Sequence, residues 1–509
     1  MASLVARAKL LKNLRHFTTT TTRPLNSSTP SSSSSTSATA ATAFSALNLA
    51  GAADTKIEPT ITTTTTTTIP KSTSILDFDD LDKLFSSVST SKLLRASANL
   101  YMASVEPIVD LGMWVMRSKL MEKQLVKDMV LGLIKRTFFE HFCAGENTVE
   151  AGNSALRLRD AGLRGMLDYA LEFACDNESC DRNMEGFLTT IESTKSLPPS
   201  IVSFVVVKIS AICPLRLLER VSDLLRWQHK NPSCSLPWKL NTFPIFSDSS
   251  PTYHTLTEPQ PLTPEEERDL QLAHQRLLTL CQECLEANLP LLVDAEHTAV
   301  QPAIDYLTYS SAIMYNKDNN PIVYGTLQAY LKDAGDRLFL ATKAAEKMGV
   351  PLGVKLVRGA YMSSERELAS SLGYESPIHN TIQDTHSSFN DCASFMLERL
   401  ANGSDALVLA THNVQSGKLA AAKAHDLGIG RVNQKLEFAQ LYGMADSLSY
   451  GLGNAGFQVS KYMPFGPIDV VMPYLLRRAE ENRGMLSSST LDRELMRKEL
   501  KRRLIAAVL

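Results

Sequence analysis

"SFVVVKISAI", residues 203–212, is a β-rich apolar run with a lysine near its end, and seven similar runs occur between residues 165 and 466. They are GMLDYALEF (165–173), LPLLVDAEH (289–297), PIVYGTLQAY (321–330), GVKLVRGAY (353–361), ALVLATHN (406–413), KLEFAQLYGM (435–444) and VSKYMPFG (459–466). Several of them are separated by helical stretches, such as 328–348, 382–401, 414–427 and 443–455. Continuous apolar strands are typical of parallel sheets covered on both faces. The pattern therefore predicts an α/β fold, a (βα)8 TIM-type barrel over residues 161–509, with a doubly wound open sheet as the alternative.

The residues before the barrel divide into two parts. MASLVARAKLLKNLRHF (1–17) is basic and amphipathic, the first acidic residue is Asp54, and the intervening tract is rich in Ser, Thr and Ala. Such a start is typical of an organelle transit peptide, so residues 1–74 are expected to be a transit peptide and a disordered low-complexity segment. Mitochondrial targeting is the first interpretation and plastid targeting the second. Residues 75–160 have helical periodicity and are expected to form a helical arm.

One connection in the predicted barrel is longer than the others. Residues 214–262, between the second and third predicted strands, begin with the helical LLERVSDLLRW and continue with a segment rich in Pro and Ser. They are expected to form a surface insertion. A helix restarts after it, where Thr263 is the expected N-cap, Pro264 takes the first helical position and Glu266 completes a capping box.

The composition is that of an ordinary soluble globular protein. The 509 residues carry a formal net charge of -2 and are 44% hydrophobic, which indicates no nucleic-acid partner. The eight cysteines are scattered, and the close pair Cys281 and Cys284 lacks a second CxxC. No metal site is therefore expected, and reduced thiols are the default. No uninterrupted apolar run reaches the roughly 18 residues of a transmembrane helix.

Polar or ionisable residues stand at the carboxyl ends of almost all predicted strands. They are Lys208, Asp294, Glu296, Gln328, Lys355, Arg358, Thr411, His412, Asn413, Gln440 and Tyr462. In TIM-type barrels these ends converge on the active site. A single residue of this kind is more often a satisfied core residue, but the convergence of so many predicts a functional site.

The segment MPYLLRRAEEN (472–482) predicts an anion-binding helix. Arg477, Arg478 and Glu481 lie three, four and seven residues after Tyr474, so the four side chains share one helix face. Two guanidinium groups beside a phenol and a carboxylate suit an anionic ligand. An ordinary solvated helix face is the alternative.

The segment GLGNAG (451–456) matches the dinucleotide-binding pattern GxGxxG but is expected not to bind a nucleotide. That motif must follow a strand and open a helix. Here the glycines follow a helical stretch and precede a predicted strand. They are expected to end the helix and turn the chain.

Eight motifs taken together resemble those of the proline dehydrogenase family. In chain order they are VVVKISA, LLVDAE, TLQAY, KLVRGAYM, ATHN, EFAQLYGM, KYMPFGP and PYLLRRAEEN, within residues 200–485. The resemblance, strongest to the mitochondrial plant enzymes, implies FAD-dependent oxidation of L-proline to 1-pyrroline-5-carboxylate, with hydride transfer from proline C5 to flavin N5. It also implies a membrane quinone as electron acceptor, a location on the matrix side of the mitochondrion and peripheral contact with the inner membrane. The basic helical segment 491–509 is a candidate for that contact, and an ordinary helix that covers the barrel is the alternative.

The resemblance assigns one group of residues to the substrate. Arg477, Arg478 and Lys208 would bind the proline carboxylate. Glu481 would hold an arginine by an ion pair, and Asp294 would support the arginines. The residues expected to wall the pyrrolidine ring are Tyr361, Leu441, Tyr462 and Tyr474. The bulk of Tyr462 favours proline over 4-hydroxyproline.

A second group lies in the family's flavin-contact motifs. Its members are Gln328, Lys355, Arg358, Gly359, Ala360, Thr411, His412, Asn413 and Gln440. Thr385, in TIQDTHSS (381–388), is expected at the nucleotide end. Bacterial members usually have Arg-Leu-Val-Lys where this chain has Lys-Leu-Val-Arg at 355–358, so Lys355 or Arg358 would be the cation near flavin N5. Met362 stands where bacterial members often have Trp, so the flavin packing is expected to differ.

Two other functions stay open from the residues. A barrel lyase or aldolase would use Lys208 or Lys355 as a Schiff-base nucleophile, which requires a lowered pKa, normally beside another cation. A non-catalytic metabolite-sensing barrel would be expected to lose the arginine pair or the flavin contacts, and this sequence keeps both. No residue is an obvious general base.

Overall fold

The computed structural model describes residues 75–429, 435–484 and 488–508. The predicted transit and low-complexity segment, residues 1–74, lies outside the described residues. Within the described ranges, no helix combines the length and the apolar character that a membrane span requires.

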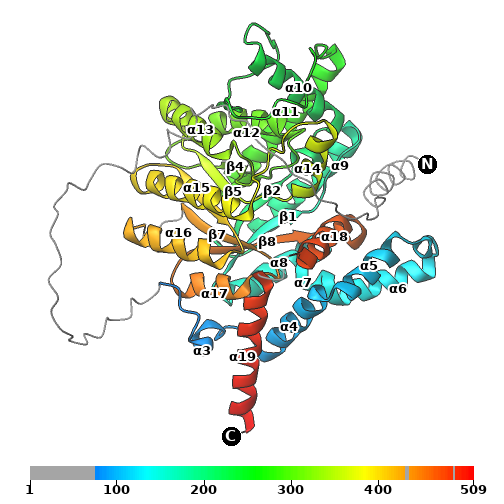
Figure 1. The fold of residues 1–509 in the computed structure, drawn as a ribbon, viewed down its shortest axis with the longest axis vertical. Helices are drawn as coiled ribbons and strands as arrows, with labels where there is room; N and C mark the ends of the chain where they lie inside the picture. Colours follow the sequence, from blue (N-terminus) through cyan, green and yellow to red (C-terminus); the bar gives the residue numbers. More distant parts are fainter. Residues whose placement is uncertain (1–74, 430–434, 485–487, 509) are drawn as a thin grey trace, which may run out of the picture. The chain divides into compact units, whose positions relative to one another are not determined.

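Eight parallel strands close into a barrel in chain order (Figure 1). They are β1 (Arg164–Tyr169), β2 (Val202–Val207), β3 (Leu291–Val293), β4 (Val323–Gln328), β5 (Gly353–Val357), β6 (Ala406–Ala410), β7 (Leu436–Leu441) and β8 (Val459–Phe465). Strands β1 and β8 complete the closure, with Met166 opposite Tyr462 and Tyr169 opposite Phe465. This pairing confirms the predicted (βα)8 barrel and excludes the open sheet, in which the first and last strands would not pair.

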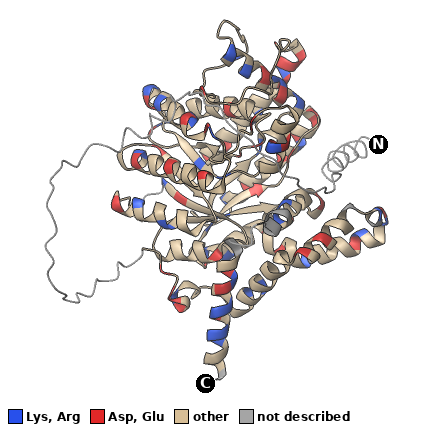
Figure 2. Ribbon diagram, viewed as in Figure 1, with Lys and Arg blue, Asp and Glu red and all other residues tan. Residues whose placement is uncertain are grey.

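Helices connect successive strands around the outside of the barrel (Figure 1). They are α9 (Asn177–Lys195) after β1, α10 (Leu215–Lys230) and α11 (Pro264–Glu286) after β2, α12 (Gln301–Tyr315) after β3, α13 (Ala334–Met348) after β4, α14 (Met362–Ser371) and α15 (Ile382–Asn402) after β5, α16 (Val414–Asp426) after β6, α17 (Asp446–Asn454) after β7, and α18 (Ile468–Gly484) and α19 (Ser488–Val508) after β8. Charged residues lie mostly on helices rather than on the strands (Figure 2). Helix α13 begins at Ala334 rather than at Gln328, because Gln328 still belongs to β4.

The interior of the barrel is packed with side chains. Met166, Phe204, Leu292 and Tyr324 belong to one buried cluster, and Tyr462 packs against it. The rings of Phe204 and Tyr324 meet edge to face, with centroids 4.9 Å apart. Eight strands enclose only enough space for such a core, so a site must lie at the ends of the strands.

The residues before β1 are largely helical. The elements are α3 (Leu81–Leu84), α4 (Thr90–Ser104), α5 (Glu106–Arg117), the 3-10 helix η1 (Lys119–Glu122), α6 (Gln124–Ile134), the π-helical turn η2 (Lys135–Phe139), α7 (Glu140–Phe142) and α8 (Thr148–Arg159). Ser89 and Asn147 cap α4 and α8, respectively, by accepting hydrogen bonds from backbone N–H groups of the first turn. The boundary between a helical arm and a catalytic domain at residues 160 and 161 stays a prediction.

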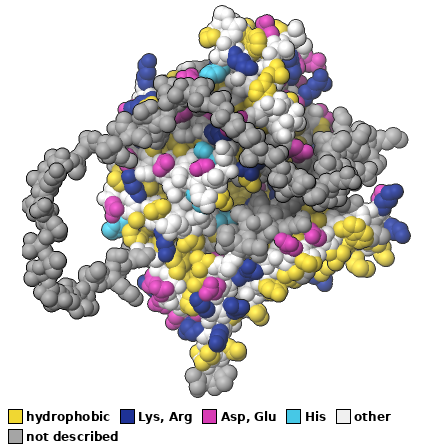
Figure 3. All heavy atoms as spheres, in the orientation of Figure 1, with side chains coloured by type: hydrophobic (Ala, Val, Ile, Leu, Met, Phe, Trp, Pro, Cys, Tyr) yellow, Lys and Arg dark blue, Asp and Glu magenta, His cyan; other side chains and the backbone are white. Residues whose placement is uncertain are grey.

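Helices α5 and α6 have one face packed on the protein and another face exposed. Met116, Leu131 and Ile134 pack against a buried cluster that includes residues of α18. Hydrophobic side chains also line the outside of this region (Figure 3). The large exposed hydrophobic residues on α5 and α6 are Leu111, Trp114, Leu125, Met129 and Leu133.

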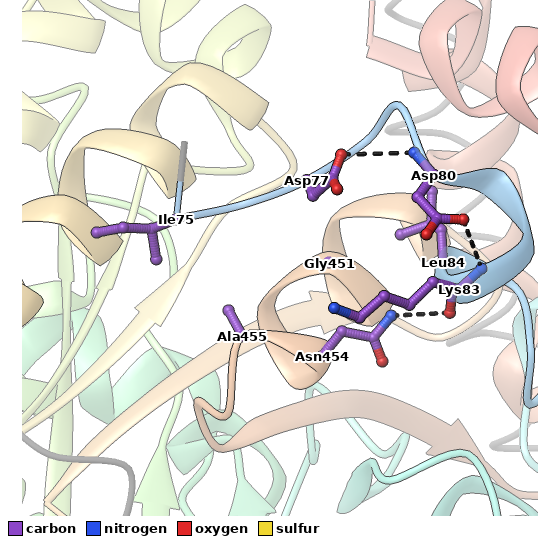
Figure 4. A pocket seen from close by; sticks show the side chains of 8 residues that line it. All are labelled: Ile75, Asp77, Asp80, Lys83, Leu84, Gly451, Asn454 and Ala455. Atoms are coloured by element: carbon purple, nitrogen blue, oxygen red, sulfur yellow. Dashed lines mark hydrogen bonds between the residues drawn. The ribbon is translucent and has the colours of Figure 1, made fainter. Parts of the chain in front are cut away.

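A small pocket lies where the first described residues meet α17 (Figure 4). Asn454 Nδ2 donates a hydrogen bond to the backbone oxygen of Lys83 at 3.1 Å across this contact. The pocket includes part of the GLGNAG segment, where Gly451–Asn454 end α17 and Gly456, with φ 88°, turns the chain toward β8. The order of helix, glycine and strand is thus the reverse of a dinucleotide-binding motif.

The long connection after β2 contains two outer helices with an irregular segment between them. Helix α10 buries Leu218 and Val221 and so belongs to the helical layer, while residues 231–263 contain no helix or strand. The irregular segment still packs on the barrel, since Phe243 is fully buried. The predicted capping box is present at the start of α11: Thr263 Oγ1 accepts from Glu266 N at 3.1 Å, and Glu266 Oε2 accepts from Thr263 N at 2.9 Å.

Candidate active site

Lys208, Asp294 and Tyr462 come from three separate strands and meet at the carboxyl ends of the barrel strands. Lys208 directly follows β2, and its Nζ lies 3.4 Å from Asp294 Oδ2 and 3.3 Å from Tyr462 OH. Tyr462 OH donates a hydrogen bond to Asp294 Oδ2 at 2.7 Å. Lys208 and Asp294 are buried, so this contact satisfies groups that water does not reach.

A second lysine binds the other oxygen of Asp294. Lys355 Nζ donates to Asp294 Oδ1 and lies 5.2 Å from the centroid of the Tyr462 ring. Asp294 is therefore placed between two lysines, and these are its ion-pair partners in the structure. The sequence-based expectation had placed it beside the arginines of α18.

Helix α18 brings the arginine pair to the same end of the barrel. Arg477 forms a two-pronged ion pair with Glu172, with Nη2 2.7 Å from Oε1 and Nη1 3.2 Å from Oε2. Arg478 is buried, and its Cζ lies 5.0 Å from the centroid of the Tyr474 ring. The side chain of Glu481 lies outside the described residues, so its expected ion pair stays a prediction.

Glu172 joins the arginine to the lysine cluster. It lies in the loop after β1, and its Oε1 is 3.7 Å from Lys208 Nζ. Burial alone would raise the pKa of Glu172, but Lys208 and Arg477 hold it below its usual value. The carboxylate of Glu172 thus bridges Arg477 and Lys208, two cations that were expected to bind the carboxylate of the substrate.

The electrostatics of this cluster keep Lys208 charged. Burial alone would lower the pKa of Lys208, but Asp168, Asp294 and Glu172 hold it well above its usual range. Asp168 Oδ1 is 3.6 Å from Lys208 Nζ. An amine in this environment binds anions and does not readily become a neutral nucleophile.

The remaining residues expected to wall a substrate lie at the same end. Tyr361 is the N-cap residue of α14, and its ring centroid is 4.0 Å from that of His297. Leu441 is the last residue of β7 and packs in the same hydrophobic cluster as Tyr474. Aromatic and aliphatic side chains therefore stand close to the cationic groups.

Arg358 connects the loops after β5 and β6. Its guanidinium donates to Thr411 Oγ1 at 2.6 Å, to Ser416 Oγ at 2.8 Å and to His386 Nδ1 at 3.1 Å. Asn413 caps α16 by accepting a hydrogen bond from Ser416 N at 2.9 Å. Two predicted cofactor residues, Thr411 and Asn413, are thus fixed around a third one, Arg358.

Hydrogen bonds also orient the other polar strand-end residues. Gln328 Nε2 donates to the backbone oxygen of Glu296 at 3.0 Å, and Gln440 Nε2 donates to the backbone oxygen of Thr411 at 3.3 Å. His412 Nε2 accepts from Leu441 N at 3.0 Å. Burial, followed by nearby cations, lowers the pKa of His412 to about 3. The imidazole is therefore neutral at physiological pH, with its proton on Nδ1.

The three remaining predicted residues, Gly359, Ala360 and Thr385, lie outside the strands. Gly359 has φ 136°, and a Cβ there would lie 2.5 Å from the ring of Tyr330, so a larger residue would not fit. Ala360 is exposed. Thr385 lies in the first turn of α15, and its Oγ1 is 3.5 Å from Thr381 O.

Four contact residues were not singled out from the sequence. Asp168 and Glu172 belong to the first predicted strand segment, and their four-residue spacing at its carboxyl end was the available signal. His386 lies inside the expected 381–388 contact segment. Ser416 had no such signal, because it is the third residue of α16, and serine is common near the start of a helix.

Comparison with known proteins identifies related sequences over most of the chain. A family model described as proline dehydrogenase matches residues 151–490. "Proline dehydrogenase 2, mitochondrial" of Arabidopsis thaliana is 59% identical over 440 residues, which are 86% of this chain and 92% of that protein. "Proline dehydrogenase 1, mitochondrial" of the same species is 61% identical over 436 residues, 85% of this chain and 87% of that protein.

A solved structure has the same fold. Proline utilization A (PutA) from Bdellovibrio bacteriovorus, inactivated by N-propargylglycine, superimposes with a TM-score of 0.58 at 18% sequence identity. The match covers 82% of this chain and 44% of the PutA chain. At this identity the likeness concerns the fold, and it agrees with the closed barrel.

Proposed function

Because this chain belongs to the proline dehydrogenase family, we propose that it oxidises L-proline to 1-pyrroline-5-carboxylate with FAD as the hydride acceptor. The protein is a mitochondrial oxidoreductase that acts on proline. Its two relatives from Arabidopsis thaliana are likewise named mitochondrial proline dehydrogenases. The observation that supports the site assignment is the meeting of Lys208, Arg477 and Arg478 with aromatic side chains at one end of the barrel.

The cations would bind the proline carboxylate. Arg477 already holds a carboxylate in a two-pronged pair with Glu172, which is the geometry that a substrate carboxylate would also use. Arg478 would add a second guanidinium and Lys208 a point charge. Anchoring the carboxylate would orient the ring between Tyr361, Leu441, Tyr462 and Tyr474, so that C5 is held in one place.

The strand ends from β4 to β7 offer a donor set that fits a flavin. Lys355 and Arg358 supply positive charge, Gln328 and Gln440 supply side-chain amides, and His412 supplies Nδ1–H. FAD, when bound, would supply the hydride acceptor, and its contacts would include Gly359, Ala360, Thr385, Thr411 and Asn413. Positive charge at Lys355 and Arg358 would favour electron uptake at this position.

Proline must react with its amine neutral. When a hydride leaves C5, the nitrogen lone pair forms the new C=N bond, and a protonated nitrogen has no lone pair to give. The activity is therefore expected to rise with pH until free proline is deprotonated. The carboxylate anchor is compatible with this, because Lys208 and Arg477, whose pKa values neighbouring carboxylates raise, stay charged over that range.

A Schiff-base mechanism is disfavoured by the surroundings of Lys208. Its three neighbouring carboxylates raise its pKa, whereas an amine nucleophile requires a lowered pKa. Lys355 is held by the carboxylate of Asp294. A metabolite sensor without catalysis is a poorer interpretation, because residues 151–490 match the model of an oxidoreductase family and the chain keeps the arginine pair.

We further propose that a membrane quinone accepts the electrons and that the protein contacts the inner membrane peripherally, on the matrix side. Two basic residues of α19 give little support to that helix as the contact, because Arg502 pairs with Asp82 and Glu499, and Arg503 pairs with Glu499. We also retain the proposed division into a transit segment (1–74), a helical arm (75–160) and a catalytic barrel (161–509).

The test is an absorption spectrum of the protein from residue 75 onward, before and after anaerobic L-proline. Flavin bands that bleach with proline, and far less with 4-hydroxyproline, are the expected result. A yellow protein unchanged by proline would remove the substrate assignment. A protein that stays colourless when FAD is supplied would remove the assignment of the strand ends to a flavin.

A further inference from the structure

The irregular segment between α10 and α11 reaches the loop after β3. His254 Nε2 lies 3.0 Å from Thr298 Oγ1. From α10, the fully buried Arg226 donates to the backbone oxygens of Thr298 and Ala299. A buried guanidinium with backbone carbonyl partners fixes the position of a loop. The loop after β3 is thus held from outside the barrel at Thr298.

Thr298 is also held from the other side, by the first turn of α14. Glu365 Oε1 accepts a hydrogen bond from Thr298 N at 2.7 Å, and Oε2 accepts one from the Thr298 hydroxyl. Glu365 is only 1% exposed, so these bonds replace water around its carboxylate. Losing one of them would leave a buried acceptor unsatisfied.

Both partners of this contact adjoin Tyr361. Glu365 lies one helical turn after Tyr361, and its backbone N–H donates to the Tyr361 oxygen at 3.0 Å. Thr298 follows His297, whose ring packs on the ring of Tyr361 with centroids 4.0 Å apart. A shift between the loop after β3 and α14 would therefore move the tyrosine ring relative to the barrel.

We propose that Thr298 is a positioning residue for catalysis: bonded to Glu365 on one side and braced by His254 and Arg226 on the other, it holds Tyr361 against the substrate. The segment 231–263 thereby acts on the active site through His254, although it lies outside the barrel. This inference rests on the proposed function, in which Tyr361 lines the proline ring.

The first test compares Thr298→Val with Thr298→Ser. Valine keeps the shape of threonine but removes the hydroxyl that joins Glu365 and His254, whereas serine keeps it. We expect Thr298→Val to raise the KM for proline about tenfold with a smaller change in kcat, because small displacements of a substrate-positioning group are costly. Thr298→Ser, which keeps the hydroxyl, is expected to have the KM of wild type. Equal KM values in the two variants would overturn the proposal.

A second readout measures binding without turnover. Cyclopentanecarboxylate has the ring and the carboxylate of proline but no oxidisable amine, and its binding can be followed by the flavin spectrum. Thr298→Val is expected to weaken it by a similar factor while the flavin content stays that of wild type. A loss of flavin in parallel with affinity would indicate a general structural defect and would count against positioning.

The control variant is Ser250→Ala. Ser250 belongs to the same irregular segment and donates to Asp333 Oδ2 at 2.6 Å, away from Thr298. Its removal is expected to leave the KM for proline unchanged. The variant to compare is His254→Leu, which removes the contact with Thr298 and is expected to raise the KM for proline. If Ser250→Ala raises the KM as much as His254→Leu does, the effect belongs to the whole segment, and the specific link through His254 is wrong.

The decisive experiment is a double-mutant cycle with Tyr361→Ala. If Thr298 acts through Tyr361, Thr298→Val has little further effect on KM once the tyrosine ring is gone. Full additivity of the two substitutions would show that they act independently and would overturn the inference. Failure of wild type to oxidise proline would instead refute the proposed function, so the two outcomes are distinguishable.

Discussion

Tyr462 combines bulk with a hydroxyl group at the centre of the candidate site. Its OH donates to Asp294 and lies within hydrogen-bond distance of Lys208, while its ring packs on the barrel core. The sequence predicted its place at a strand end, but not these two partners. Strand alternation specifies which residues converge, whereas the pairing depends on side-chain conformations across the barrel.

Replacing Tyr462 by Ser is expected to narrow the preference for proline over 4-hydroxyproline, because a small side chain leaves room for a ring substituent. The measurement is the ratio of kcat/KM for the two substrates. Tyr462→Phe keeps the bulk without the hydroxyl and is expected to keep the preference. An unchanged ratio in Tyr462→Ser would contradict the steric argument.

The burial of Glu296 is expected to make the free energy of unfolding depend on pH. It is fully buried, its Oε1 accepts from Ser210 N at 3.1 Å, and its Oε2 has no hydrogen-bond partner among the described residues. Burial raises its pKa from 4.5 to about 7. Between these values the folded state binds a proton that the unfolded state has lost, so the free energy of unfolding falls as pH rises.

The substitution Glu296→Gln should remove this fall in the free energy of unfolding, which amounts to about 3 kcal/mol at most. The difference between the unfolding midpoints of the variant and of wild type is expected to grow as the pH rises from about 5 to about 8. Chemical denaturation at several pH values provides the measurement. A constant difference across this range would mean that Glu296 does not titrate there.

At the scale of the elements, the eight strands were predictable because each is an unbroken apolar run between helical stretches. The start of α13 was not, since residues 329–333 form a turn that follows β4 without a change in hydrophobic pattern. The partner of Arg477 was also beyond prediction. Glu172 lies 305 residues earlier in the chain, and only barrel closure brings β1 and α18 together.

The start of α11 offers a local test of element stability. Thr263→Ala removes the acceptor for Glu266 N and with it one half of the capping box. The free energy of unfolding is expected to fall by about 1 kcal/mol. Thr263→Ser keeps the hydroxyl and is expected to stay within experimental error of wild type in urea denaturation. Equal losses in both variants would mean that the methyl group, rather than the cap, is what matters.

At the scale of the whole molecule, α19 packs against α4 and α3. Glu499 is fully buried and accepts hydrogen bonds from Arg502 and Arg503. Arg503 in turn donates to the backbone oxygens of Val88 and Phe85, at 2.7 Å and 2.8 Å. The sequence showed α19 only as a basic helical pattern, for which contact with a membrane surface and an ordinary helix covering the barrel were the two interpretations, and it gave no sign of the contact with α3 and α4.

Glu499→Gln is expected to lower the free energy of unfolding by about 1 to 3 kcal/mol, because it weakens three charge-assisted hydrogen bonds from Arg502 and Arg503. The KM for proline should not change, since none of these residues belongs to the candidate site. Glu494→Gln, at an exposed ion pair with Lys498 on the same helix, is the matched control. Comparable destabilisation by both variants would show that helix charge, and not the buried contact, is responsible.

The contact between Arg503 and Val88 joins positions 415 residues apart. Pairings of such separation form late in folding, since nearly the whole polypeptide must be confined before they can be made. An imported precursor enters its organelle amino end first, so α3 and α4 arrive long before the helix that covers them. During that interval their apolar surfaces are open to aggregation. We therefore expect the maturing chain to depend on the chaperones of the receiving compartment until α19 has docked.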